Sequence, residues 1–149
     1  MGFDVFTPMR WRIKGNGGEK QRILEPVIQD LLFVYSDRET LDDVVRRIDT
    51  LQYRFVKNGK GNPLVVNEKE MQRFIHAVKD SDKVKYYLPE ELSAMSPGRK
   101  IRIIGGPMDG YQGKLLTVRG SKVRRIIVEI PKFIYAGIEI NPNFIEFLD

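Results

Sequence analysis

Cysteine is absent from the 149 residues, and histidine occurs once, at His76. The first absence excludes disulfides, thiol nucleophiles and cysteine-ligated metals. The lone histidine stands in an expected helix beside Ile75, where a partly covered surface position is a simpler interpretation than a general base. Serine, lysine and the acidic residues show no catalytic or metal-ligand spacing. The sequence therefore predicts a protein that is not an enzyme and that holds no cofactor or metal.

Long apolar runs are also absent. No run approaches the roughly 20 residues that a transmembrane helix needs, and the first residues lack the charged, apolar and small-residue regions of a signal peptide. Glycine and proline together make 21 of the 149 residues, which is near the ordinary level, so no stretch is typical of disorder. We expect a cytoplasmic protein without membrane contact, folded nearly throughout, with one ordinary core or two small ones.

The net charge of +5 is unevenly distributed. Residues 1–97 carry 16 basic and 15 acidic side chains, a net charge of +1, whereas residues 98–149 carry 9 and 5, a net charge of +4. Lys122, Arg124 and Arg125 lie in one short basic segment and are candidates for contact with nucleic-acid phosphates. Contact with an acidic protein face and simple solvation of a hairpin are the alternatives that the sequence leaves open.

The N-terminal half has the pattern of a mixed α/β fold. Residues 3–12 form a short apolar segment interrupted by Pro8, which is typical of an edge strand, and the polar, glycine-rich residues 14–20 predict a hairpin tip. Residues 31–35 (LLFVY) are a continuous apolar run, which predicts a strand covered on both faces. A further hairpin is expected between residues 53–56 and 63–66, with its turn at residues 58–61.

Two amphipathic helices are expected beside these strands. Thr40 is the expected cap of the first helix and Asn67 of the second, where Glu70 stands at the capping-box position. Each helix has apolar residues at helical spacing, which are Leu41, Val44, Val45 and Ile48 in the first and Met71, Phe74, Ile75 and Val78 in the second. Both apolar faces are expected to pack on one sheet.

The α/β pattern ends in a stretch with charges and prolines. We interpret residues 83–97 as a linker between domains of residues 1–82 and 98–149. The segments that follow are all strand-like, at residues 100–104, 114–118, 123–130, 133–140 and around 144–147. Five short strands in about 50 residues predict a small closed β-barrel. The fold class is therefore α+β.

The glycine-rich segment 98–114, GRKIRIIGGPMDGYQGK, is the most specific motif. We expect Gly105, Gly106 and Gly110 to take backbone angles that are closed to other residues, and Gly113 to let the second strand begin close against the first. Pro107 presets one turn angle. The segment does not match the phosphate-binding loop pattern, so nucleotide binding is not expected.

This segment resembles the KOW motif, with the G-x-x-[VI]-x-[VI]-x-x-G-P-[FM]-x-G-x-x-G pattern of NusG-type factors and some ribosomal proteins. Upstream, residues 3–10 (FDVFTPMR) and 27–35 (VIQDLLFVY) resemble the second and third strands of the NusG N-terminal (NGN) domain. The chain is similar in particular to RfaH and to the UpxY-type antiterminators of capsular polysaccharide operons. The resemblance implies an N-terminally shortened NGN-type α/β sandwich, without the family's first strand and helix, followed by a five-stranded KOW (SH3-like) barrel.

The resemblance also implies a regulator of transcription elongation or antitermination. In this family an apolar patch on the NGN sheet docks on the clamp helices of RNA polymerase, and the matching residues here are Ile28, Leu31 and Phe33. For each of them an ordinary core position is the alternative. A KOW protein that binds the ribosome or RNA without polymerase is the alternative function, which the basic barrel alone would favour.

The KOW loop is implied to recruit a second partner, either a ribosomal protein or a termination factor. The candidate contact residues are Ile104, Met108 and Tyr111, presented by the glycines and the proline of the loop, and packing of these side chains onto the barrel is the alternative. A sheet without the family's first strand and helix exposes an edge and apolar surface, which predicts either self-association or a sequence that is truncated at its N-terminal end.

Overall fold

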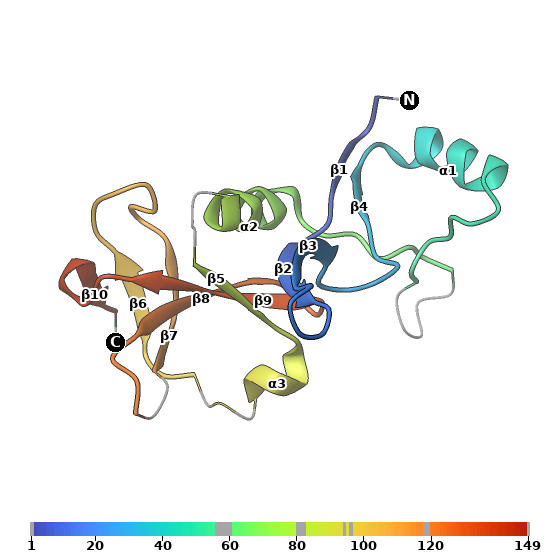
Figure 1. Ribbon diagram of the computed structural model, residues 1–149. Coiled ribbons are helices and arrows are strands. Elements are labelled where there is room, and N and C mark those ends of the chain that lie inside the picture. The colour runs from blue at the N-terminus through green and yellow to red at the C-terminus, as the bar shows by residue number, and fades with distance from the viewer. Residues whose placement is uncertain are drawn as a thin grey trace. The chain divides into compact units, whose positions relative to one another are not determined.

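Two units make up the chain, an N-terminal unit of Met1–Leu64 and a C-terminal unit of Val65–Asp149. The computed structural model describes residues 2–55, 61–79, 83–93, 95, 97–117 and 120–148 (Figure 1). Within these ranges, no helix is long and apolar enough to cross a membrane. The mixed α and β composition agrees with the predicted fold class, and most of the strands lie in the C-terminal unit.

The N-terminal unit contains two short antiparallel sheets. Its strands are β1 (Asp4–Phe6), β2 (Met9–Lys14), β3 (Gln21–Pro26) and β4 (Phe33–Tyr35), paired as β1 with β4 and β2 with β3. The strand expected over residues 3–12 is split at Pro8, which has no N–H for a ladder and is buried where β1 gives way to β2. The carbonyl of Pro8 instead accepts a hydrogen bond from Val27 at 2.8 Å. The hairpin tip predicted over residues 14–20 is confirmed, because β2 and β3 pair on either side of it.

The apolar run LLFVY is less regular and less covered than its sequence predicts. Only Phe33–Tyr35 form a strand, and Asp30 just before the run has a left-handed backbone with φ of 60°. Leu32 is 47% exposed and Tyr35 is 60% exposed. The prediction of cover on both faces is wrong, because β4 pairs only with β1 among the described residues and a two-stranded ribbon cannot bury both faces.

Helix α1 (Arg38–Arg47) begins at Asp37 rather than at Thr40. The carboxylate of Asp37 accepts hydrogen bonds from the backbone N–H of Thr40 at 2.8 Å and from its hydroxyl at 2.9 Å. These bonds favour the charged form of the carboxylate and so lower the pKa of Asp37. The bond from the backbone N–H of Thr40 has the largest effect. The prediction that Thr40 caps this helix is wrong. The N-cap residue is Asp37, and the Thr40 hydroxyl donates a hydrogen bond to it. The apolar stripe of α1 is only half-buried.

The segment after α1 is tied to the helix by Tyr53. Its hydroxyl donates to the Asp42 carboxylate at 2.7 Å, and loss of hydration together with this bond raises the pKa of Tyr53 to about 12. The hairpin predicted here is present as a single antiparallel bridge between Phe55 and Pro63, with a bond from the Leu64 N–H to the Arg54 carbonyl at 2.7 Å. Most of its predicted turn, residues 58–60, lies outside the described residues.

The C-terminal unit is a six-stranded antiparallel sheet with two helices. Its elements are α2 (Glu68–Lys79), β5 (Val84–Tyr87), α3 (Pro89–Ser93), β6 (Lys100–Ile103), β7 (Gln112–Thr117), β8 (Arg124–Ile130), β9 (Ile134–Ile140), the 3-10 helix η1 (Pro142–Phe144) and β10 (Ile145–Phe147). All five predicted strands are present, as β6 to β10. The strand order is β10-β6-β7-β8-β9-β5. The core is built mainly of isoleucines with almost no exposure, which are Ile101, Ile126, Ile130, Ile134 and Ile138.

The sixth strand, β5, comes from the segment that the sequence suggested was a linker. It pairs with β9 from Val84 opposite Ile138 to Tyr87 opposite Tyr135, and Tyr87 is buried. Because this aromatic segment gains both hydrogen bonds and burial at the sheet edge, residues 84–87 belong to the sheet. The division between units falls at residues 64 and 65, which is ahead of the expected linker at 83–97.

Helix α2 packs on β8 and β9 of this sheet (Figure 1). The predicted cap is confirmed, since the Asn67 side-chain oxygen accepts from the backbone N–H of Lys69 at 2.9 Å and of Glu70 at 3.4 Å. Phe74 and Ala77 are fully buried. The prediction that both helices pack on one sheet is wrong, because α1 and α2 belong to different units.

Candidate functional site

The predicted polymerase-binding residues lie close together along the chain of the N-terminal unit. Ile28 follows β3 in a bend, Leu31 precedes β4, and Phe33 begins β4 opposite Phe6 of β1. All three side chains are half-buried. Leu31 lies outside the strand, so strand alternation does not place it on the same face as Phe33, and the left-handed turn at Asp30 separates Ile28 from both.

Exposed apolar side chains surround these residues on the β1–β4 ribbon. Val5 lies opposite Val34 and is 57% exposed, and Leu32 and Tyr35 are exposed as well. Register and strand alternation put Phe6, Phe33 and Tyr35 on one face of this ribbon, which we call the β1–β4 surface, and Val5 and Val34 on the other face. An exposed apolar ribbon of this kind is suited to the apolar face of a partner helix.

The glycine-rich loop of the C-terminal unit, at residues 104–111, is closed by its own backbone. The N–H of Gly110 donates to the Ile103 carbonyl at 2.8 Å, and the Ile103 N–H donates to the Tyr111 carbonyl at 2.9 Å. The Asp109 carboxylate accepts from the N–H of Gly105 at 2.6 Å. Left-handed angles are confirmed for the three predicted glycines, with φ of 84°, 73° and 84° at Gly105, Gly106 and Gly110. The loop therefore presents its side chains from a fixed backbone.

Gly113 is needed for a different contact from the one expected. It pairs with Ile101 of β6, but a Cβ atom at this position would lie 2.3 Å from the carbonyl oxygen of Ile127 on β8. The same atom would lie 2.9 Å from the Ile126 side chain. The glycine thus allows β7 to lie close to β8 rather than to β6.

Tyr111 holds the loop to α2. Its hydroxyl donates to the Arg73 carbonyl at 3.1 Å and lies 2.5 Å from Nδ1 of His76, which is then the donor to the hydroxyl oxygen. The imidazole is stacked on the phenol ring, with centroids 5.6 Å apart and planes at 20°. The Arg73 guanidinium carbon lies 5.4 Å from the ring centroid. Tyr111 therefore has a packing role inside this unit.

The other two candidate contact residues lie beside a hollow of 240 Å³ under the loop. Met108 is half-buried in its wall, which also includes the buried Ile103 and the exposed Phe144. Ile104 is 48% exposed next to it. This hollow is apolar enough to receive one side chain of a partner protein.

The basic segment is divided by strand alternation. Arg124 and Arg125 are successive residues of β8 and so point to opposite faces of the sheet. The Arg124 guanidinium donates to the Ser121 carbonyl at 3.4 Å, whereas Arg125 is 18% exposed and pairs with Glu139 at 3.6 Å. Lys122 is exposed. The structure thus leaves Lys122 and Arg124 accessible and partners Arg125 internally.

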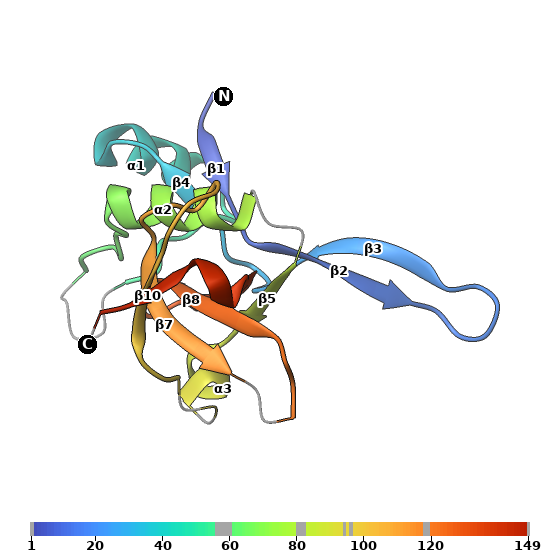
Figure 2. The same cartoon turned by 90° about the vertical axis from the view of Figure 1, so that its left-hand side faces the viewer.

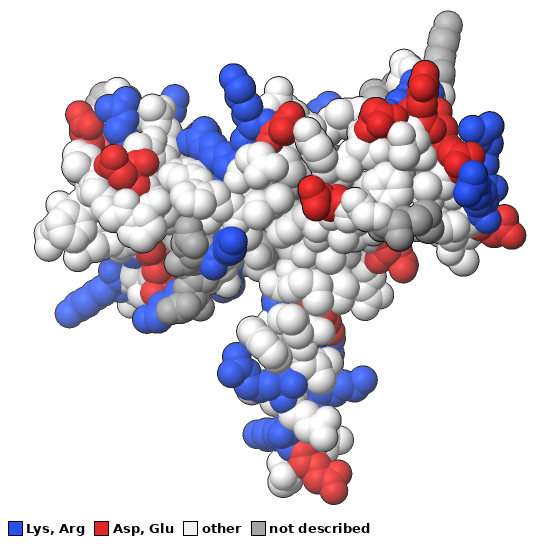
Figure 3. Space-filling model, turned by 90° about the horizontal axis from the view of Figure 1, so that it is seen from above, with Lys and Arg blue, Asp and Glu red and all other residues white. Residues whose placement is uncertain are grey.

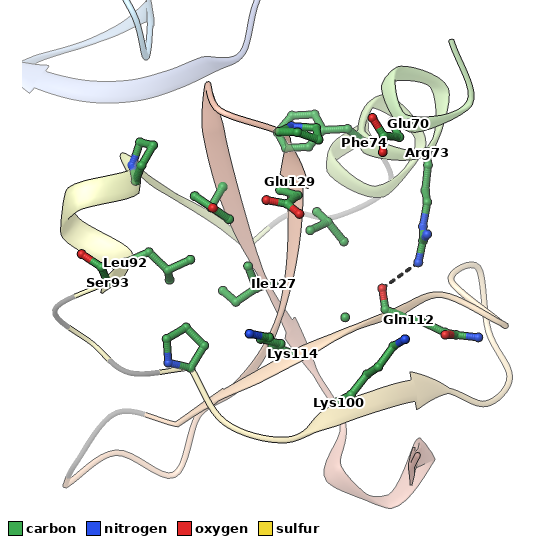
Figure 4. A pocket seen from close by; sticks show the side chains of 16 residues that line it. Glu70, Arg73, Phe74, Leu92, Ser93, Lys100, Gln112, Lys114, Ile127 and Glu129 are labelled. Atoms are coloured by element: carbon green, nitrogen blue, oxygen red, sulfur yellow. Dashed lines mark hydrogen bonds between the residues drawn. The ribbon is translucent and has the colours of Figure 1, made fainter. Parts of the chain in front are cut away.

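A larger cavity of 580 Å³ lies between α2, α3 and strands β6 to β8 (Figure 4). Arg73 reaches across its edge and donates to the Gln112 carbonyl at 2.6 Å. Lys100 and Lys114 are directly opposite each other on neighbouring strands, and Glu129 lines the same wall. Its charges are mixed, and in the part of the chain that the structure describes no three acidic or histidine side chains gather as a metal site.

Comparison with protein families identifies the N-terminal half. The family model described as transcription termination factor nusG matches residues 1–75. The chain belongs to the NusG family. No curated protein matches it at a significant level. NusG-family proteins are regulatory transcription factors that bind RNA polymerase, not enzymes.

The family match extends past the N-terminal unit of this NusG-family chain. It covers residues 1–64 and continues to residue 75, inside α2, although α2 packs on the sheet of the C-terminal unit. Phe74 and Arg73, which contact that sheet or its loop, are thus part of the matched region. In this NusG-family chain, the family match therefore ends at residue 75, whereas the boundary between the two packed units falls between residues 64 and 65.

Sequence reasoning missed one surface of this NusG-family chain, the β2–β3 hairpin. Every residue of β2 is exposed, and Trp11 on it carries the guanidinium carbon of Arg22 at 4.7 Å from its ring centroid. The signal was available in residues 9–14, MRWRIK, where apolar and basic residues alternate strictly. Such alternation predicts a ribbon with one apolar and one basic face.

Removing only the hydroxyl of Tyr111 tests its packing role. We expect Tyr111→Phe to lower the free energy of unfolding by about 1 kcal/mol, because the ring remains while the bonds to α2 are lost. Urea denaturation and hydrogen exchange of the α2 amides measure the effect. Tyr35→Phe, at an exposed tyrosine of the N-terminal unit, is the control with little expected change. If Tyr111→Phe is as stable as the unmodified chain, the Tyr111 hydroxyl does not hold the loop to α2.

Proposed function

We propose that the chain is a regulator of transcription elongation or antitermination that binds RNA polymerase through the β1–β4 surface. The observation that supports this is the exposed apolar ribbon around Phe33, which lies within the residues matched to the NusG family. The proposed docking partner is the pair of clamp helices of the polymerase. The resemblance of residues 3–10 and 27–35 to the UpxY-type factors supports antitermination at capsular polysaccharide operons as the specialised role.

The chemistry of the β1–β4 surface suits a helix better than a small ligand. Tyr35 is 60% exposed and shares its face of the ribbon with the half-buried Phe33, so burial of their apolar area needs a partner with an extended apolar face. Phe33 is half-buried on this surface and is the proposed anchor, and Ile28 and Leu31, which are also half-buried, precede it in the chain. Self-association through the same ribbon would compete with docking on polymerase.

Phe33→Ala tests the anchor. We expect a loss of about 2 kcal/mol in binding to core RNA polymerase, which is roughly a thirtyfold rise in Kd, because aromatic anchors dominate such interfaces. Surface plasmon resonance with immobilised polymerase measures Kd, and circular dichroism checks that the variant stays folded. Val65→Ala removes an exposed apolar side chain from the other unit and is the matched control. Equal Kd values for Phe33→Ala and Val65→Ala would refute the assignment.

The C-terminal unit is proposed to be the KOW module, which recruits a ribosomal protein or a termination factor. Ile104 and Met108 at the hollow are the proposed contact residues, and Tyr111 supports them by fixing the loop to α2. Binding to RNA or the ribosome without polymerase is less well supported as the main function. Of the three basic candidates, Arg125 is already ion-paired with Glu139.

A further inference from the structure

The cavity between α2, α3 and strands β6 to β8, which we call the α2–α3 cavity, has the size of a small-molecule site. Its volume is 580 Å³, and such sites measure roughly 300–1,000 Å³. Figure 2 shows α2 above and α3 below the strands β7 and β8. The residues that line it are all different from those around the hollow under the glycine-rich loop. The cavity is therefore distinct from the proposed partner contact of that loop.

One part of the α2–α3 cavity is apolar. Leu92 of α3 and Ile127 of β8 are 6% and 8% exposed, and they belong to one buried cluster with Tyr87 and Leu116. Leu92 and Ile127 are the members of this cluster that also line the cavity (Figure 4). The buried Phe74 lines the cavity from α2. A ligand in the cavity would thus meet an apolar floor.

Two lysines face each other beside this floor. Lys100 of β6 is the register partner of Lys114 of β7, which puts their Cβ atoms about 5 Å apart. Like charges directly opposite each other destabilise a sheet. Over most of the face shown in Figure 3, basic and acidic side chains are mixed. Among the described residues, however, neither Lys100 nor Lys114 makes an ion pair.

The acidic side chains of the cavity do not cancel its positive charge. Glu129 is hydrogen-bonded with Tyr135, its register partner on β9. Loss of hydration and this carboxylate raise the pKa of Tyr135, so its hydroxyl keeps the proton that it donates. The cavity is lined by three basic residues (Arg73, Lys100 and Lys114) and two acidic ones (Glu70 and Glu129), a net charge of +1. An anion between the two lysines would remove their mutual repulsion.

We propose that the α2–α3 cavity binds a small phosphate monoester, with its phosphate between Lys100 and Lys114 and an apolar or aromatic body against Ile127 and Leu92. Register supports this division of the ligand. Lys114 lies directly opposite Ile127, and neighbouring strands are about 4.8 Å apart, so the phosphate site and the apolar floor adjoin. The site is separate from both proposed protein contacts and goes beyond the proposed function.

The charge of the lysine pair favours a phosphate monoester over other anions. A monoester carries nearly two negative charges at pH 7, because its second pKa is about 6, whereas a carboxylate carries one. Lysine binds phosphate as a point charge, so two lysines match one dianion. A phosphate of a nucleic-acid backbone carries one charge, and the chain continues from it on both sides. A monoester has one ester link, which leaves its body free to enter the cavity.

A ligand series tests the proposal on the unmodified full chain. Phenyl phosphate, inorganic phosphate and benzoate are titrated in turn, and the methyl NMR signals of Ile127 and Leu92 report Kd and the place of binding. We expect phenyl phosphate to bind about tenfold more tightly than inorganic phosphate, because its ring buries apolar area. We also expect it to bind about tenfold more tightly than benzoate, which has the same ring but a single charge.

The lysine pair is tested by the double variant Lys100→Gln with Lys114→Gln. We expect it to bind phenyl phosphate about 10- to 100-fold more weakly, in line with the loss of charge-assisted hydrogen bonds. The matched control is Lys69→Gln with Lys79→Gln, which removes two exposed lysines of α2 that do not line the cavity. Its Kd should stay within about twofold, because exposed charges at a distance are screened. Circular dichroism checks that both variants are folded.

Four results would overturn the proposal. The first is the absence of saturable shifts at Ile127 and Leu92 with phenyl phosphate. The second is an equal Kd for phenyl phosphate and inorganic phosphate, because the apolar floor would then have no part in binding. The third is an equal effect of the two double variants, which would indicate only general attraction. The fourth is displacement of phenyl phosphate by an oligodeoxythymidylate without a terminal phosphate, which would identify a nucleic-acid backbone as the ligand.

Discussion

Replacing Phe74 by alanine is expected to lower the free energy of unfolding by about 3–5 kcal/mol, which is the usual cost of removing a buried phenylalanine. The ring is 1% exposed and lies 6.5 Å from the ring of Tyr86, centroid to centroid. It is the largest side chain by which α2 packs on the sheet of the C-terminal unit. Loss of the Phe74 ring would leave a cavity between α2 and β8, and α2 would pack less tightly on the sheet.

Urea denaturation followed by circular dichroism measures this loss, and hydrogen exchange at the β8 amides locates it. Phe55→Ala is the matched control, because Phe55 is 53% exposed and belongs to the N-terminal unit. We expect the control to cost less than about 1 kcal/mol. Similar losses for the two variants would contradict the packing of α2 on this sheet.

Gly113→Ala is expected to cost about 3 kcal/mol, the upper part of the range for overpacked sites. The added Cβ would lie 2.3 Å from the Ile127 carbonyl oxygen, and a backbone atom in the middle of a paired strand cannot move aside as a flexible side chain can. The strands β7 and β8 would have to separate around residues 113 and 127, with loss of ladder hydrogen bonds.

The thermal and urea transitions of Gly113→Ala should therefore both fall. Gly18→Ala provides the control, because a Cβ there meets nothing within 4 Å and its backbone is not left-handed. That substitution should be neutral, or slightly stabilising through the unfolded chain. If Gly113→Ala unfolds at the same urea concentration as Gly18→Ala, the close approach of β7 to β8 is not present in solution.

Local patterns predicted much of the C-terminal unit. The five strands β6 to β10 follow apolar segments bounded by turn residues, and the loop glycines follow from their required backbone angles. The Asn67 cap was visible because an amide side chain stood directly before an apolar helical stripe. These features depend on neighbours within a few residues, which a sequence displays directly.

Other features depend on partners distant in the chain, and sequence patterns did not predict them. Strand β5 joins the sheet through β9, some fifty residues later, and the Pro89 that follows suggested a linker instead. The run at residues 31–35 is apolar enough for a buried strand, yet burial requires a covering layer that an apolar run does not specify. For the candidate site, the sequence predicted the loop but not the hydrogen bond from the Tyr111 hydroxyl to the Arg73 carbonyl of α2.

We propose that this NusG-family chain binds RNA polymerase through its N-terminal unit. The most direct measurement is association of the full chain with purified core polymerase by surface plasmon resonance, repeated with free clamp-helix fragment as competitor. We expect saturable binding that the fragment abolishes. Absence of binding, or binding that the clamp-helix fragment leaves unchanged, would contradict it.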